Sequence, residues 1–356
     1  MLIKMQVGEQ DRGELQVNVT DSDNAPIRDA RVTISEPETA INPNSPIERL
    51  ETDVSGQTQI VDLNTPPLEY SLNENNENMP YANYNIQIEA PGYETENISN
   101  VEILPDSLSL QDVRMRRREG EQVENIDIDP HTLYAEYPEK IPEDEIKDVN
   151  EPGEIVLSRV VIPEYVVVHN GTPSSNARDY YVTYKDYIKN VASSEIYATW
   201  PRATIEANVL AIMSFTLNRV YTEWYRNKGY DFTITSSTAY DQKWIYGRNI
   251  FQSIDEVVDE IFDQYLSRPD VRQPILTQYC DGKRVTCPNW LSQWGSCNLG
   301  EQGFGTLEII RNYYGDDMYI NTAEQISGIP ASWPGYDLTI GASGQKGMQM
   351  QDCLLY

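Results

Sequence analysis

The residue with the clearest catalytic potential is Glu195, which stands in the small and largely apolar run NVASSEIYATWP at residues 190–201. Five residues recur at helical spacing up to this point: Tyr184, Ile188, Val191, Ala192 and Glu195. The spacing predicts a helix that begins near Thr183 and places Glu195 on its buried face at the C-terminal end. Burial and the negative end of the helix dipole both disfavour a carboxylate anion there. Glu195 is therefore a candidate general acid; the alternative is a helix-end glutamate that turns to water or pairs with Arg202.

Histidine and cysteine are too sparse to supply most other catalytic chemistries. His131 and His169 are the two histidines of the chain, which disfavours a His-rich metal site or a His-based triad. Cys280 and Cys287 flank the turn-forming segment DGKRVT, so a local disulfide and free buried thiols both stay open. Zinc would require short CxxC pairs or additional histidines. We expect neither a metal nor another cofactor.

Composition limits the partners of the chain. Its 356 residues are enough for two or three domains, and 27 Lys and Arg against 56 Asp and Glu give a net charge of −29. Nucleic acid and anionic membrane would repel such a chain, so a neutral, glycan-like partner fits better. No run of eighteen apolar residues occurs, and the N-terminus MLIKMQVGEQD is too short and too polar for a secretory signal.

The first 115 residues predict an all-β sandwich. Short apolar strands such as LQVNV, ARVTI, TQIVDL, YNIQIEA and VEIL alternate with Gly, Pro, Asn and Asp turns. No nucleophile, metal cluster or phosphate-binding loop appears among them, which indicates a packing module without chemistry. Residues 116–153 are rich in charge and proline and predict an exposed linker. Arginines 116 to 118 fit either a basic cleavage site or a solvated charge run.

Residues 154–328 predict a mainly helical α+β domain. Pro201 suits the first turn of a second helix that is apolar on most sides from Ile205 to Val220 and that we expect to close at Gly229. Ser253 and Glu256 form a capping-box pattern before a covering helix. The polar and aromatic segment TITSSTAYDQKWIYG predicts a loop that lines a site, and a short helix is expected from about Thr306.

The order of these segments resembles the SpoIID-type lytic transglycosylases, which cleave peptidoglycan in spore-forming bacteria. The resemblance rests on YKDYIKNVASSEIYATWP, then EANVLAIMSF, STAYDQKWIYG, LSQWG and EIIRNYYG, over roughly residues 182–317. With the front sandwich, KIPEDEIK, EWYRNKGYDFTITSSTAYD and LTQYCDGKRVTCP included, the chain is more specifically similar to the proenzymes of clostridial spore cortex-lytic enzymes.

The resemblance implies that Glu195 is the catalytic acid and base, acting on the bond between N-acetylmuramic acid and N-acetylglucosamine in cortex during germination. The C6 hydroxyl of the muramic acid attacks, so one carboxylate suffices and the product carries a 1,6-anhydromuramic end. The implied substrate-binding residues are Ser194, Thr238, Gln242, Tyr246, Ser292, Gln293 and Trp294. Trp200 fits the core better than a cleft.

The chain departs from the family pattern in three places. The loop SSTAYDQKW has neither Cys nor His, PNWLSQWG stands where the family has Gly-His-Gly, and Met213 replaces a common arginine. Zinc is therefore not expected, although some family members bind it.

The segment PGYDLTIGASGQKGMQMQ resembles the opening of a peptidoglycan-binding module, through Leu338, Gly341, Gly344, Met350 and Gln351. Because such a module needs about 60 residues to bury a core, residues 329–356 are expected to be an incomplete start.

As a proenzyme, the chain would be cut near residues 114–124, with Gln122 and Val123 as the favoured bond and a subtilisin-like protease as the activator. The resemblance places it in the spore, outside the core, with cortex peptidoglycan as its partner. One alternative is a non-catalytic wall-binding or coat protein that keeps the fold. A metal-dependent amidase is disfavoured because only His169 lies beyond the linker.

Overall fold

The computed structural model describes residues 11–37, 46–118, 123–147, 157 and 159–328. These residues form eighteen strands and six α-helices and divide into two compact units. Unit 1 comprises Met1–Glu136, Ser193–Trp200 and Ile245–Glu256, and unit 2 comprises Tyr137–Ala192, Pro201–Trp244 and Val257–Tyr356. The chain is therefore multidomain, and each unit combines segments that are distant in the sequence. No helix in the described part of the chain is long and apolar enough to cross a membrane.

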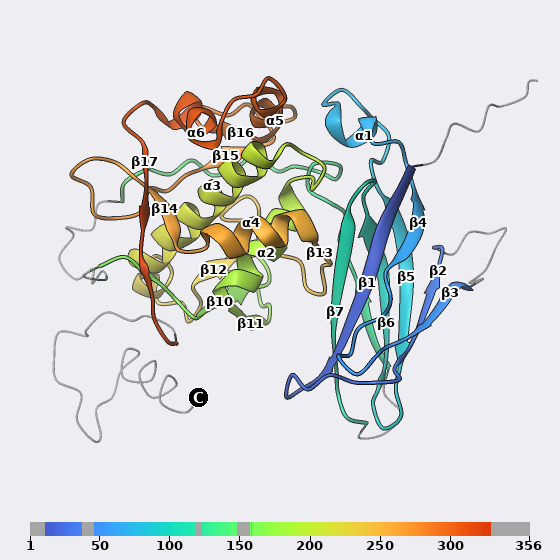
Figure 1. The fold of residues 1–356 in the computed structure, drawn as a ribbon. Helices are drawn as coiled ribbons and strands as arrows, with labels where there is room; N and C mark the ends of the chain where they lie inside the picture. The colour runs from blue at the N-terminus through green and yellow to red at the C-terminus, as the bar shows by residue number, and fades with distance from the viewer. Residues whose placement is uncertain (1–10, 38–45, 119–122, 148–156, 158, 329–356) are drawn as a thin grey trace, which may run out of the picture. The chain divides into compact units, whose positions relative to one another are not determined.

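Unit 1 is built on two sheets (Figure 1). The first has the order β13-β7-β1-β4, formed by Ile250–Phe251, Leu108–Met115, Asp11–Asp21 and Val61–Thr65. The second has the order β3-β2-β5-β6-β8, formed by Pro46–Glu51, Arg31–Ser35, Ala82–Glu89, Thr95–Ile103 and Val123–Asp127. A single-turn helix, α1 (Glu69–Leu72), follows β4. Alternating buried and exposed residues along β1 and β4 give each strand one core face.

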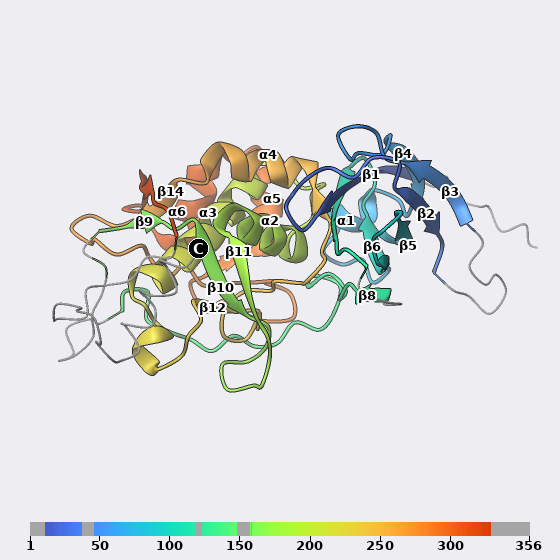
Figure 2. The same cartoon turned by 90° about the horizontal axis from the view of Figure 1, so that it is seen from below.

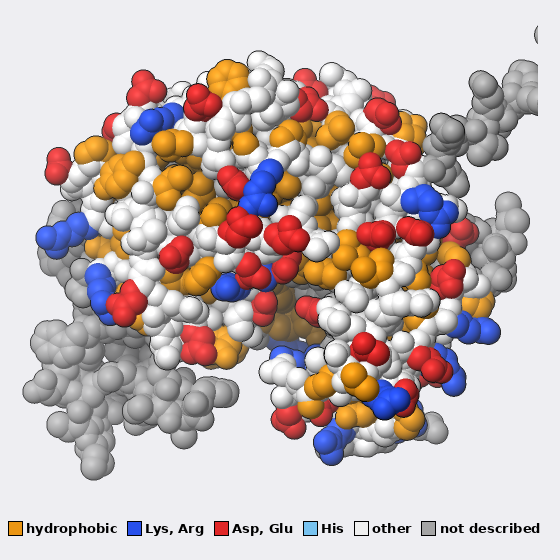
Figure 3. All heavy atoms as spheres, in the orientation of Figure 1, with side chains coloured by type: hydrophobic (Ala, Val, Ile, Leu, Met, Phe, Trp, Pro, Cys, Tyr) orange, Lys and Arg blue, Asp and Glu red, His pale blue; other side chains and the backbone are white. Residues whose placement is uncertain are grey.

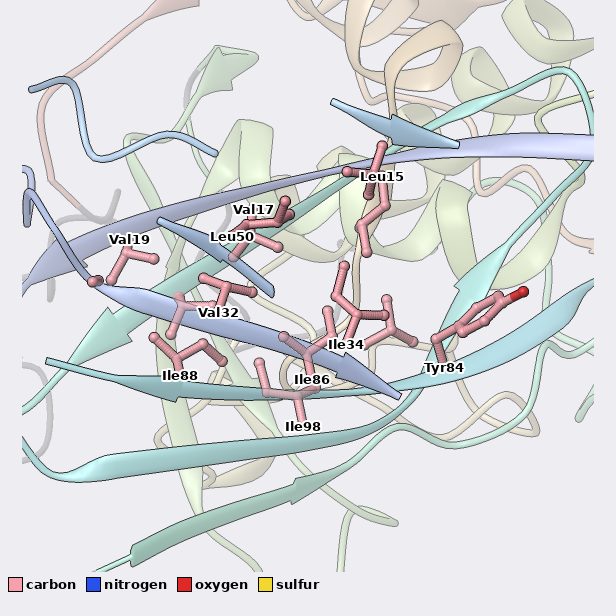
Figure 4. Packing of buried hydrophobic residues seen from close by; sticks show 14 of the residues in the cluster. Leu15, Val17, Val19, Val32, Ile34, Leu50, Tyr84, Ile86, Ile88 and Ile98 are labelled. Carbon is pink, nitrogen blue, oxygen red and sulfur yellow. The ribbon is translucent and has the colours of Figure 1, made fainter. Parts of the chain in front are cut away.

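The core of unit 1 lies between the two sheets. Leu15, Val17 and Val19 of β1 face Val32, Ile34, Ile86, Ile88 and Ile98 of the second sheet, and all eight are at most 2% exposed (Figure 4). Ile245, which is far from these strands in the sequence, belongs to the same cluster. The all-β prediction for the first 115 residues agrees with these sheets, which also recruit β8 and β13 from later in the chain.

Unit 2 contains most of the helical structure. α2 (Tyr184–Glu195) reaches unit 1 only with its last three residues, and α3 (Arg202–Tyr221) lies wholly in unit 2. α4 (Gln252–Ile261) enters unit 2 at Val257, and α5 (Gln293–Glu301) and α6 (Thr306–Tyr314) complete the set. β10 (Tyr165–His169) pairs with β11 (Asp179–Thr183) and with β12 (Ile234–Thr235) (Figure 2).

The remaining strands of unit 2 are two to four residues long and pair two by two. They are β9 (Val161–Ile162) with β18 (Glu324–Gln325), β14 (Gln264–Ser267) with β17 (Tyr319–Thr322), and β15 (Tyr279–Cys280) with β16 (Leu291–Ser292).

α3 is the central helix of unit 2, as its apolar sequence predicts. Pro201 occupies its N-cap, and residues from Ile205 to Tyr221 are buried on every side except for Glu206. The helix ends at Tyr221 rather than continuing to Gly229, because Glu223 adopts φ 46°. A 3₁₀ turn, η1 (Arg226–Lys228), follows, and Gly229 closes that turn with φ 86°.

Residues 123–147 differ from the exposed linker expected over 116–153. β8 pairs with β6 in unit 1, His131 is fully buried, and Lys140 and Lys147 are each 6% exposed in unit 2. That expectation rests on the scarcity of aliphatic residues, but charged residues can be buried when they are paired. Lys147 forms such a pair with Glu143. Residues 148–153 lie outside the described residues, as do Gln122 and the expected module at 329–356.

Acidic side chains are scattered over the face of the molecule drawn in Figure 3. On that face the Lys and Arg side chains do not gather into a continuous basic region. This distribution agrees with the net charge of −29.

Candidate active site

Glu195 is the last residue of α2 and is fully buried. The helical spacing that predicts this position is confirmed, because Tyr184, Ile188, Val191 and Ala192 are each at most 1% exposed. At the start of the helix Thr183 and Asp186 bond each other reciprocally, with the Asp186 amide donating to Thr183 Oγ1 at 3.3 Å. The interpretation of Glu195 as a water-facing helix end is wrong. Arg202 pairs with Glu206 and Glu260 instead.

The carbonyl groups at the C-terminal end of α2 have dedicated partners within unit 1. The last turn of a helix leaves carbonyls without helical donors. Arg248 donates to Ser193 O from Nη2 at 2.8 Å and from Nε at 3.2 Å. The Thr132 amide donates to Ser194 O at 3.0 Å. A cation at the negative end of a helix is also electrostatically favourable.

His131 holds the residues that follow Glu195. Its Nδ1 accepts from the Leu133 amide at 3.2 Å, which leaves Nε2 to donate to Ile196 O at 3.3 Å. Its ring also packs against Tyr197, with 4.5 Å between ring centroids. The backbone on both sides of Glu195 is thereby held by residues of unit 1.

The end of the same segment is tied to α1. Trp200 Nε1 donates to Ser71 O at 2.9 Å, and Thr199 Oγ1 donates to Ser71 Oγ at 2.8 Å. Trp200 is 3% exposed, as the prediction of a core position requires. Ser253 lies inside α4 rather than at its N-cap, and its hydroxyl donates to Ala198 O at 3.0 Å.

Arg248 also forms a buried ion pair with Glu102 of β6. Their side chains are 0% and 2% exposed, respectively. Burial raises the pKa of Glu102 to about 7, against the opposing effect of the Arg248 cation. Asn249 adds two hydrogen bonds to the Glu102 backbone, donating to its carbonyl at 2.8 Å and accepting from its amide at 3.1 Å. Sequence reasoning missed this cluster, although a glutamate inside the apolar strand VEIL was a usable indication.

The predicted substrate-binding residues divide between the two units. Ser194 and Tyr246 belong to unit 1, whereas Thr238, Gln242, Ser292, Gln293 and Trp294 belong to unit 2. Ser194, Thr238, Gln242, Gln293 and Trp294 are buried. Tyr246 is half-buried and donates to Glu124 Oε1 at 3.3 Å, and Ser292 caps α5 by accepting from the Gly295 amide at 2.9 Å.

Gln242 is bonded at both ends of its amide group within unit 2. Its Oε1 accepts from Tyr187 OH at 3.0 Å and from Thr216 Oγ1 at 2.9 Å, and its Nε2 donates to Ile212 O at 3.0 Å. In this arrangement Gln242 joins α2 and α3 and is a structural residue. The polar, aromatic segment at residues 233–247 predicts a loop that lines a site, but its residue Gln242 is buried and forms hydrogen bonds inside the protein.

A second buried charge cluster, also missed from the sequence, lies around Arg219. Its guanidinium donates to Asp241 Oδ1 at 2.8 Å and to Glu143 at 2.5 and 3.0 Å. Asp241 also accepts from Tyr225 OH at 2.7 Å and from the amide and hydroxyl of Thr235 at 2.9 and 2.6 Å. Although burial alone would raise the pKa of Glu143, Arg219 and Lys147 lower it. Every charge in the cluster has a partner, as a structural role requires.

His169 sits between an aspartate and a serine in the hairpin of β10 and β11. Its Nδ1 lies 2.7 Å from Asp179 Oδ1, and its Nε2 lies 3.2 Å from Ser175 Oγ. The serine hydroxyl donates to Thr172 O at 2.7 Å instead, and Nε2 is equally close to Ser175 O. We therefore interpret these contacts as stabilising the loop between β10 and β11.

Cys280 and Cys287 form a disulfide, with 5.7 Å between their Cα atoms. Asp281 organises the enclosed turn by accepting from the amides of Lys283 and Val285 at 3.1 and 3.0 Å. Cys297 is buried, and Cys353 lies outside the described residues. Among the residues that the structure describes, no three His, Cys, Asp or Glu side chains are grouped to hold a metal ion.

Comparison with known proteins identifies no family. No protein-family model and no curated protein matches the chain. Among solved structures, the minor pilin GBS52 of Streptococcus agalactiae aligns at 17% identity with a TM-score of 0.22, over 32% of this chain and 48% of the pilin. The catechol 1,2 dioxygenase of Acinetobacter radioresistens aligns at 13% identity with a TM-score of 0.22, over 33% of this chain and 58% of the enzyme. The chain thus spans about half of these proteins, and likenesses this weak carry no functional inference.

Proposed function

We propose that this chain is the precursor of a peptidoglycan lytic transglycosylase of the clostridial SleC type, with a SpoIID-like catalytic domain and Glu195 as its catalytic acid and base. The observation that carries the proposal is the position of Glu195: a carboxyl group in the motif NVASSEIYATWP, fully buried at the end of α2. The sequence resemblance supplies the reaction, and the fixed backbone around Glu195 supports its role.

The reaction needs one carboxyl group to transfer a proton twice. Protonated Glu195 donates its proton to the glycosidic oxygen as the bond from C1 of N-acetylmuramic acid breaks. The resulting carboxylate then takes the proton of the C6 hydroxyl as O6 bonds to C1, which regenerates the acid and closes the 1,6-anhydro ring. Because the attacking hydroxyl belongs to the same sugar, no second carboxylate is needed to activate water.

The burial of Glu195 in the intact chain supports a precursor. A carboxyl group with no exposed surface cannot contact a polysaccharide, so the uncut chain should be silent. Cleavage near Gln122 and Val123 by a subtilisin-like protease would begin the activation. Val123 is 56% exposed, and Gln122 lies outside the described residues. The expected location is the spore outside its core, with cortex peptidoglycan as the partner.

The test is mass spectrometry of the muropeptides released from decoated spore cortex by the uncut and the cut chain. The proposal predicts 1,6-anhydromuramic ends from the cut chain after its two fragments are separated, and none from the uncut chain. Reducing muramic ends would indicate a hydrolase, and release from the uncut chain at the same rate would contradict the precursor.

A non-catalytic cortex-binding or coat protein is the second candidate. This candidate is favoured because predicted sugar-contacting residues form hydrogen bonds within the protein. The clearest case is Gln242, whose amide group has protein partners at both ends. Binding to cortex sacculi without any released anhydro-muropeptide would select this candidate.

A further inference from the structure

The segment at residues 245–251 is an integral part of unit 1, although it follows the sandwich by more than a hundred residues. Its strand β13 pairs antiparallel with β7, so that Ile250 lies opposite Leu110 and Phe251 opposite Ser109. Edge strands expose unpaired backbone groups, and β13 covers this edge of β7. Gln111 Nε2 adds a hydrogen bond to Gly247 O at 3.1 Å.

Two buried side chains fasten the segment to β6. Asn249 exchanges a pair of hydrogen bonds with the Glu102 backbone, at 2.8 and 3.1 Å, and is itself fully buried. Arg248 forms its ion pair with the Glu102 carboxylate in the same place. Separating the segment from the sandwich would leave these groups without their partners, which is costly for buried polar groups.

The sandwich also pairs with the strand that directly follows residues 119–122 in the sequence. β8, which begins at Val123, pairs in parallel with β6 from Thr95 to Ser99. Asn97 supports this pairing through its side chain, which donates to Asn125 Oδ1 at 3.0 Å. A cut within 119–122 therefore breaks one covalent connection and none of these non-covalent contacts.

We infer that the segment 245–251 is a docking site for the sandwich, and that cleavage between residues 118 and 123 yields a two-chain complex in which the N-terminal fragment stays bound. The inference rests on the proposed function only for the place of the cut. Activation then requires a second step, release of the fragment. Arg248 couples this step to the candidate active site, because the same guanidinium that pairs with Glu102 holds Ser193 O, two residues before Glu195.

The experiment uses the full chain with a specific endoprotease site inserted after residue 120. After complete cutting, size-exclusion chromatography with light scattering is run over about a hundredfold dilution, and the dissociation constant Kd of the two fragments is determined. The inference predicts co-elution at the mass of the intact chain, 40.7 kDa. Dissociation of the cut parent chain across the whole dilution range would overturn it.

Asn249→Ala tests the docking site. We expect Kd to rise by about tenfold or more, because two buried hydrogen bonds are lost. Asn18→Ala is the matched control: Asn18 donates to Asp112 Oδ1 at 2.8 Å within the sandwich, and its loss should leave Kd unchanged. Equal effects of the two substitutions would overturn the assignment.

Circular dichroism of the uncut variants establishes that each folds. If Asn249→Ala does not, Arg248→Met replaces it, since methionine removes the ion pair with Glu102 across the cut; an unchanged Kd would then overturn the assignment. The readout is fragment association, so absence of lytic activity would count against the proposed function alone.

Discussion

Two buried arginines, one in each unit, form ion pairs of similar burial but different connectivity. Arg219 in unit 2 bonds Asp241, 22 residues away, and Glu143, both on the same side of residues 119–122. Arg248 in unit 1 pairs with Glu102, which lies on the other side of those residues. A cut there leaves the first cluster on one chain and divides the second between two chains. Similar chemistry can therefore serve permanent architecture in one place and a separable connection in another.

The largest effect is expected from Arg219→Met. Removing this guanidinium leaves the carboxylates of Asp241 and Glu143 buried without their main counter-ion. We expect unit 2 to lose about 3–5 kcal/mol of unfolding free energy. Urea denaturation followed by tryptophan fluorescence measures it, since Trp224 lies 5.1 Å from the guanidinium. Arg202→Met, at an exposed ion pair, is the control and should cost less than about 1 kcal/mol; equal costs would refute the comparison.

Arg248→Met should cost less than Arg219→Met and should depend on pH. Glu102, with a pKa near 7, can take up a proton and lose its charge when Arg248 is removed. We expect about 1–3 kcal/mol, smaller at pH 6 than at pH 8. Hydrogen exchange of β7 and β13 provides the measurement. A cost that is the same at both pH values would show that Glu102 does not titrate in this range.

Glu96→Gln tests the attachment of β8. Burial first, and the facing Glu124 second, raise the pKa of Glu96 from 4.5 to about 7, against the effect of Arg116. The native state thus favours the protonated form, so this stabilisation is complete below pH 4.5 and lost as the pH rises through 7. Glutamine stays neutral, and the variant should gain on the parent up to about 3 kcal/mol as the pH rises. Thermal unfolding at pH 5 and pH 8.5 measures the difference; an equal difference at both would contradict the assignment.

Thr199→Val should have the smallest effect. It removes one hydroxyl that bonds Ser71 Oγ at 2.8 Å, and the hydrogen bond from Trp200 to Ser71 O persists. A loss of about 1 kcal/mol is expected, again by thermal unfolding. A loss comparable with that of Arg248→Met would mean that α1, rather than Arg248, dominates the fixation of this segment.

Local patterns predicted the elements of this fold well. The repeat ending at Glu195 gave the burial and the end of α2, and the apolar stretch after Pro201 gave α3. Contacts between segments that are distant in the sequence are harder to predict from local patterns. Asn249 meets Glu102 147 residues earlier, and neither neighbouring sequence specifies that pairing. The run VEIL is the exception, because a strand buried at four successive positions must be covered on both faces, and residues 248–249 supply the cover at Glu102.

The site is harder to predict than the fold, because a polar residue in the sequence can face either the solvent or a partner in the interior. The sequence predicts that Asp241 and Gln242 belong to a loop that lines a site, yet both side chains are fully buried and bonded internally. The composition predicts an exposed linker around Glu143 and Lys147, yet these two residues form an ion pair beside Arg219. In each case a buried partner, invisible to local pattern, decides where the polar group lies.

The central claim is that Glu195 transfers the proton, and Glu195→Gln tests it most directly. Glutamine keeps the size of the side chain and removes its titratable proton. Both proteins are cut at residues 119–122, the fragments are separated, and released muropeptides from decoated cortex are quantified by mass spectrometry. The account predicts 1,6-anhydromuramic ends from the parent and a fall of about 10²–10⁴-fold in the variant, with unchanged binding to cortex. Equal release of anhydro-muropeptides by both proteins would contradict it.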